Sequence, residues 1–112
     1  MFDIIFEAIG DLFDLIGDGV AIFVGAVLSF FDWVVDYFRG LKLRRGRDIP
    51  FIADERKLAD LIHKAPQKNV GIFQGVYNED TDKIEHYRSL EADEMDEDLK
   101  RTLGREKLVV LN

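Results

Sequence analysis

The chain has 112 residues, of which 22 are acidic and 15 are basic, and its formal net charge is −7. This length allows one ordinary domain, or one small domain with an appended segment. The acidity argues against nucleic acid as a main partner, because binding phosphates requires a basic face. Cysteine is absent, which excludes disulfides, thiolate metal ligands and thiol nucleophiles.

The charges divide the sequence into three parts. Residues 1–38 contain no lysine or arginine and are mainly apolar, with acids between the apolar side chains. Residues 39–50 contain the basic cluster, which is Arg39, Lys42, Arg44, Arg45 and Arg47. Residues 51–112 are mixed in charge and acidic on balance. We therefore predict an α+β chain with an apolar helical arm (1–38), a basic joint (39–50) and a small α+β domain (51–112).

The acids of the arm follow a helical spacing. They form an acidic stripe at Asp3, Glu7, Asp11, Asp14, Asp18, Asp32 and Asp36. Small side chains at Ala21, Gly25 and Ser29 keep the interval of three or four residues between Asp18 and Asp32. Nearly every position off this line is large and apolar. The pattern predicts a long helix with a narrow polar stripe and a broad apolar surround.

Small residues in the arm suggest a packing face. Gly17, Ala21 and Gly25 stand four apart, a spacing that lets two helix backbones approach closely. The alternative is that the glycines are simply tolerated. The triplet Gly17–Gly19 is also the weak point of a continuous helix, because each glycine costs about 1 kcal/mol relative to alanine. A break there would leave helices at residues 2–16 and 19–38.

The arm has several features of a membrane-spanning helix. Its uncharged run, Gly19–Phe31, is shorter than the roughly 20 residues that a bilayer requires, so insertion must include an aspartate near one end. An aromatic and basic boundary follows at once, formed by Trp33, Tyr37, Arg39, Lys42, Arg44, Arg45 and Arg47. This order predicts a single-pass membrane protein, in contact with lipid, whose C-terminal domain is cytoplasmic. The alternatives are a helix buried in a cytoplasmic soluble oligomer and a helix lying in the membrane interface.

The C-terminal part predicts a helix, two strands, a helix and a strand. We expect a helix over 53–65, capped by Asp54, and a hairpin of two strands over 69–78 and 82–92. A capped helix over 93–104 should end at Gly104, and the strand KLVVLN should follow. If that last strand lies at a sheet edge, it can pair with another chain.

The sequence carries no motif that names a reaction. Asn78, Asp80 and Asp82 match the start of a calcium loop, but Lys83 and Ser89 stand where that loop needs glycine and glutamate, so we interpret the segment as a turn. We predict no catalytic residue, no cofactor and no metal site, and hence a protein that is not an enzyme.

Three functions remain open at this stage. The first is a small membrane-anchored structural or accessory protein that self-assembles or docks partners, including other membrane subunits. The second is a soluble oligomeric scaffold whose N-terminal helices form the oligomer core. The third is an oligomeric pore whose acidic stripe attracts cations.

Overall fold

The framework of the computed structural model, which describes residues 2–16 and 21–111, is a five-stranded mixed sheet in the order β1-β5-β4-β3-β7. Its strands are β1 (Ala21–Phe23), β3 (Asp48–Asp54), β4 (Val70–Asn78), β5 (Lys83–Ala92) and β7 (Leu108–Val110). β1 runs parallel to β5, and the other neighbours are antiparallel. The α+β class predicted from the sequence is therefore confirmed.

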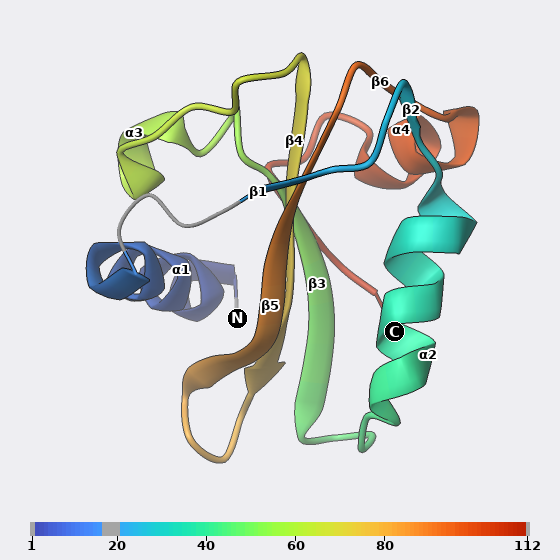
Figure 1. Cartoon of the computed structure of the whole chain (residues 1–112). Coiled ribbons are helices and arrows are strands. Elements are labelled where there is room, and N and C mark those ends of the chain that lie inside the picture. The colour runs from blue at the N-terminus through green and yellow to red at the C-terminus, as the bar shows by residue number, and fades with distance from the viewer. Residues whose placement is uncertain (1, 17–20, 112) are drawn as a thin grey trace.

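Helices cover both faces of this sheet. Figure 1 shows α1 (Phe2–Ile16) and α3 (Ala59–Ile62) on one side, and α2 (Asp36–Leu41) and α4 (Glu97–Leu103) on the other. A π-helical turn, η1 (Phe30–Val35), leads directly into α2. Two short strands, β2 (Val27–Leu28) and β6 (Glu94–Met95), form a separate parallel pair.

β4 lies at the centre of the sheet and determines the layers around it. All nine of its residues are buried. Successive side chains of a strand point to opposite faces, and accordingly Phe73 and Tyr77 join the apolar cluster under α1, whereas Ile72 and Val76 join the cluster under α2. A strand whose side chains are apolar on both faces of the sheet requires a helical layer on each face.

The N-terminal residues supply much of both layers. Ile5, Ile9 and Phe13 of α1 are buried against Phe51 and Phe73, and the rings of Phe13 and Phe73 are 5.1 Å apart. On the other face, the cluster includes Leu28, Val34, Phe38, Ile52, Ile72 and Leu90. Each cluster therefore contains residues from both sides of the boundary that we drew at residue 50.

The prediction of one long apolar helix over 1–38 is wrong. α1 ends at Ile16, Ala21–Phe23 form a strand, and the next helical residues begin at Phe30. The physical reason is tertiary pairing: β1 aligns with Ser89–Glu91 of β5, and that ladder replaces the hydrogen bonds that a helix would make. Among the described residues, no helix combines the length and the apolar character needed to span a membrane.

The C-terminal elements follow the prediction with three differences. β4, β5 and β7 lie where the sequence indicated, but α4 is shorter than the helix predicted over 93–104, because Glu94–Met95 form β6 and the Asp96 carboxylate accepts the Leu99 N–H at 2.9 Å as the cap. The first predicted helix is shorter, because the Asp54 carboxylate accepts the Arg56 N–H and holds a turn before α3. β3 was not predicted either, because Pro50 suggested the end of a joint. Pro50 is tolerated since it lies where the pairing with β7 ends.

Substitutions in α1 test whether this helix belongs to the core. Ile9 is fully buried and Leu15 is 83% exposed. We expect Ile9→Ala to lower the free energy of unfolding by about 2–5 kcal/mol, and Leu15→Ala to change it by less than about 0.5 kcal/mol. Chemical denaturation of the full chain measures both. If Ile9→Ala changes the free energy of unfolding as little as Leu15→Ala does, α1 does not pack on the sheet.

Candidate functional site

A groove runs along β7, between that strand, helix α2 and the loop 42–47. It consists of two adjoining hollows of about 610 and 600 Å³ that share Leu43, Pro50, Val110 and Leu111. We call it the β7 groove. Its apolar lining is Phe30, Val35, Phe38, Leu43, Ile49, Pro50, Val109, Val110 and Leu111, and its basic residues are Arg39, Arg44 and Arg45.

The loop 42–47 places the basic residues beside this apolar lining. Lys42 ends α2 in the left-handed conformation (φ 52°, ψ 58°) and turns the chain back toward the sheet. Asp48 then fixes the loop, because its carboxylate accepts the Arg44 N–H at 2.8 Å and pairs with the Arg47 guanidinium at 3.0 Å. These contacts lower the pKa of Asp48, with the Arg47 hydrogen bond as the main cause.

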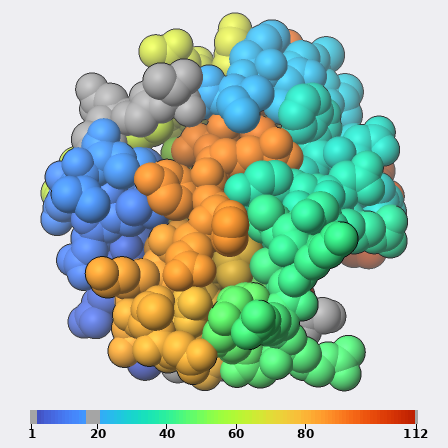
Figure 2. Space-filling view, turned by 60° about the horizontal axis from the view of Figure 1, so that its bottom comes forward, coloured from blue at the N-terminus to red at the C-terminus, as the bar shows by residue number. Residues whose placement is uncertain are grey.

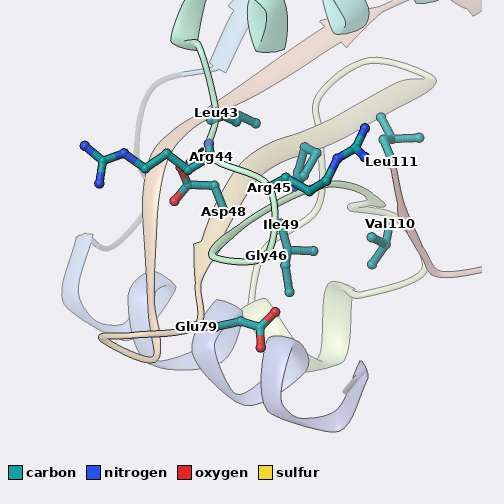
Figure 3. A pocket seen from close by; sticks show the side chains of 10 residues that line it. Leu43, Arg44, Arg45, Gly46, Asp48, Ile49, Glu79, Val110 and Leu111 are labelled. Atoms are coloured by element: carbon teal, nitrogen blue, oxygen red, sulfur yellow. Dashed lines mark hydrogen bonds between the residues drawn. The ribbon is translucent and has the colours of Figure 1, made fainter.

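Two arginines of the loop extend into solvent, and the charge of Arg44 also acts on Asp48. Arg44 and Arg45 are exposed, and neither forms an ion pair within the described part of the chain. Figure 3 shows them extending in opposite directions from the loop, with Arg45 on the side of Leu111. Glu79 also lines the groove. The groove thus combines apolar side chains with a local excess of positive charge in a chain whose net charge is −7.

The outer edge of β7 has unused backbone groups. Leu111 donates its N–H to Pro50 O at 2.8 Å, and Asp54 donates its N–H to Lys107 O at 2.9 Å. Because hydrogen-bonded pairs alternate along an antiparallel ladder, the N–H and C=O of Leu108 and Val110 point away from β3. β7 is the last strand of the sheet, and no described strand pairs with this edge.

A second feature is a buried acid behind α3. Glu55 is 1% exposed, and its nearest cation is the Lys64 ammonium, 3.9 Å from Oε2. Burial raises the pKa of Glu55 to about 7, although Lys64 and the Ser89 hydroxyl act in the opposite direction. The neighbouring buried acid, Glu91, accepts the backbone N–H groups of Gln67 and Lys68. Glu55 is a proton-binding group inside the fold, and solvent hardly reaches it.

In comparisons with known protein families, curated proteins and solved structures, nothing matches this chain. The arrangement of the described residues therefore carries the functional argument by itself.

The acidic stripe is divided between two sides of the molecule. Asp3, Glu7, Asp11 and Asp14 are exposed on α1, whereas Asp32 and Asp36 are exposed on η1 and α2, across the sheet. Asp18 lies outside the described residues. The stripe is one line in the sequence and two separate surfaces in the structure.

The predicted helix-packing residues do not share a helix. Ala21 begins β1, and Gly25 lies in the following loop with φ at 107°, a value that glycine adopts without strain. Gly17 lies outside the described residues. The spacing of four residues therefore gives no common face for Ala21 and Gly25.

The residues predicted at a membrane interface have different surroundings in the fold. Trp33 and Tyr37 are half-buried against Arg88, whose guanidinium carbon lies 5.6 Å and 4.1 Å from the two ring centroids. In the basic cluster, Arg47 pairs with Asp48 and Lys42 ends α2. Arg39, Arg44 and Arg45 line the β7 groove.

Glu55 and the apolar side of the groove were not predicted from the sequence. Glu55 stands among charged residues in ADERK, where nothing distinguishes a buried acid from an exposed one. The groove had one signal, since the apolar KLVVLN strand was predicted to pair with another chain if it lay at an edge. β7 does lie at the sheet edge.

The buried acid predicts a dependence of stability on pH. The pKa of Glu55 is about 7 in the folded chain against an ordinary value of 4.5, so folding takes up a proton between these pH values. The contribution of Glu55 to stability is therefore favourable at low pH and is lost as pH rises through 7. We expect Glu55→Gln to match the wild type near pH 4.5 and to exceed its free energy of unfolding by about 2–3 kcal/mol above pH 7.

Denaturation curves from pH 4.5 to 8 measure this difference. Glu106→Gln is the matched control, because Glu106 is exposed, and its difference from the wild type should stay flat. A Glu55→Gln difference that is also flat would contradict the burial of a protonated carboxyl group.

Proposed function

We propose that this chain is a protein-docking module whose β7 groove binds an extended, acidic and partly apolar segment of a partner protein. The observation that carries the proposal is the coincidence of three features in one place. They are a strand edge with which no described strand pairs, a half-buried apolar lining, and two exposed arginines, Arg44 and Arg45, that form no ion pair among the described residues.

The apolar lining supplies affinity. Val109, Val110 and Leu111 are each only partly covered and line the groove together with Leu43 and Pro50. Val109 and Leu111 lie on the α2 face of the sheet, and Val110 lies on the α1 face. Removing such surface from water is worth about 25 cal/mol per Å². A partner segment therefore gains most by placing apolar side chains in the two hollows.

The strand edge supplies direction and shape. Lys107 and Leu111 form their backbone hydrogen bonds with β3. The N–H and C=O groups of the alternate residues, Leu108 and Val110, therefore point away from the sheet. An extended segment can add to such an edge as a further strand, with alternate side chains in pockets on either side. A helix has no free backbone groups to offer, so the groove favours an extended partner.

The arginines select the charge of the partner. Arg44 and Arg45 are exposed and lack ion pairs among the described residues, and Arg39 has only a distant contact with Asp36 at 4.0 Å. Acidic residues of the partner form ion pairs with these arginines and steer its approach, although each exposed ion pair adds little affinity.

This proposal keeps the partner docking predicted from the sequence and leaves membrane insertion aside. Insertion would expose Ile5, Ile9, Leu28 and Val34 to lipid, and all four are fully buried in the fold. The cation pore is left aside as well, because the acids of its lumen stand on opposite sides of the sheet. We propose binding as the role of this chain, with no catalytic step.

A peptide selection tests the groove directly. A library of random twelve-residue peptides is selected on the full chain, and the enriched peptides are resynthesised with a fluorophore. We expect enriched sequences to alternate apolar with acidic residues. Fluorescence anisotropy should show about tenfold weaker binding to the Arg44→Glu, Arg45→Glu variant, since two attractions become repulsions.

The control for this experiment is Lys57→Glu. Lys57 is exposed in the turn before α3, where its ammonium reaches Glu106 O, and it does not line the groove, so this variant should bind the peptides as the wild type does. Selection of no peptide, or of peptides that bind the arginine variant equally well, would overturn the proposal.

A further inference from the structure

A small cavity lies on the α1 side of the sheet, apart from the β7 groove. Its volume is about 250 Å³, and its lining includes Phe13 of α1, Lys64 after α3, Phe73 of β4, and Tyr87 and Ser89 of β5. Figure 2 shows α1 (blue) lying against β5 (orange) at the surface of the molecule. We call this hollow the α1–β5 cavity.

Three aromatic rings form the apolar wall of the cavity. The ring centroids of Phe13 and Phe73 are 5.1 Å apart, and the Tyr87 ring stacks on Phe73 at 6.1 Å with 27° between the planes. Phe13 and Phe73 are buried, whereas Tyr87 is 39% exposed. Aromatic rings pack on one another offset or edge to face, so this wall favours a ligand that carries one more ring.

Lys64 and Ser89 form the polar end of the cavity. The Lys64 side chain is 15% exposed, and its Nζ lies 5.7 Å from the centroid of the Phe13 ring. An ammonium has three N–H donors and can contact more than one acceptor, and the Ser89 hydroxyl is a further donor. Arg88 also lines the cavity, but its guanidinium donates to the carbonyl of Trp33, whose ring packs on the other face of the sheet.

A buried acid stands behind this polar end. Glu55 is 1% exposed, and its Oε2 lies 3.9 Å from the Lys64 ammonium. Neither carboxyl oxygen makes a hydrogen bond of normal geometry with a described residue, although the Ser89 hydroxyl is close enough to lower the pKa of Glu55. Glu55 is not among the lining residues of the cavity. Buried ionisable groups with perturbed pKa values are concentrated at functional sites.

We propose that the α1–β5 cavity binds a small aromatic carboxylate, with its ring against Phe73 and Tyr87 and its carboxylate on Lys64. This inference names a second site and does not rest on the docking function of the β7 groove. A carboxylate accepts from the ammonium and from the Ser89 hydroxyl, and hydrogen bonds between charged groups are the stronger kind. A ligand amine is disfavoured, because the cavity presents an ammonium to it while the acid lies behind.

Binding at this site is coupled to the protonation of Glu55. Burial is the main cause that raises the pKa of Glu55 to about 7; Glu91 and Asp54 also raise it, whereas Lys64 and Ser89 lower it. A ligand carboxylate on Lys64 adds a negative charge nearby, which raises this pKa further. Binding therefore takes up a proton, and the affinity falls as pH rises through 7.

Titration of the full chain with benzoate, followed by NMR of the backbone amides at pH 6 and pH 8, tests the site. Benzoate is ionised at both pH values. We expect the shifted amides to include Lys64, Tyr87 and Ser89, and the dissociation constant to be about fivefold larger at pH 8. Benzamide and benzylamine are the comparison probes, and each should bind at least about tenfold more weakly than benzoate at pH 6.

Three variants separate the roles of the residues. Glu55→Gln should bind benzoate equally well at both pH values, because the group that takes up the proton is gone. Lys64→Met should bind benzoate at least about tenfold more weakly and benzamide nearly unchanged. Lys100→Met is the control, because Lys100 is exposed on α4, on the other face of the sheet, and it should bind benzoate as the wild type does. The NMR spectra verify that every variant is folded.

The opposite results would overturn the inference. They are a wild type that does not bind benzoate, benzylamine that binds as tightly as benzoate, shifts confined to residues outside the cavity, and a Lys64→Met variant that binds benzoate like the wild type. A pH dependence that persists in Glu55→Gln would overturn the coupling to Glu55. Peptide selection at the β7 groove is a separate measurement, so either proposal can fail while the other stands.

Discussion

The burial of β4 on both faces is the constraint on which the rest of the structure depends. All nine residues of Val70–Asn78 are buried, in the middle strand of a five-stranded sheet. Two layers of apolar side chains must cover such a strand, and residues 51–112 alone contribute only α3 and α4 as helices. The apolar N-terminal third therefore becomes part of the fold, with α1 on one face and η1 and α2 on the other.

The same arrangement explains why the candidate site lies at β7. The helical layers leave part of β7 uncovered, and this strand is only three residues long. Its side chains Val109 and Val110 stay partly exposed. The loop that returns the chain from α2 to β3 must pass this edge, and it carries the arginines. Fold and groove thus share one cause, which is the order of the strands.

The local features of the C-terminal half could be predicted from the sequence. The β4–β5 hairpin, the end of α4 at Gly104 and the final strand all depend on neighbouring residues. The region 18–38 could not be predicted in the same way, because β1 forms through pairing with Ser89–Glu91, far along the chain. One overlooked signal was that β4 is apolar on both of its faces. Val70, Ile72 and Val76 lie on one face, and Phe73 and Tyr77 lie on the other. The groove arginines were noticed, but they were assigned to lipid instead of to the edge of a sheet.

Hydrogen exchange of the full chain tests whether the N-terminal third is part of the cooperative core. α1 packs its buried face on β3 and β4 through Ile5, Ile9 and Phe13. We expect amides in the middle of α1 to exchange only when the whole chain unfolds, at rates like those of β4. Rapid exchange throughout α1 while β4 stays protected would contradict it.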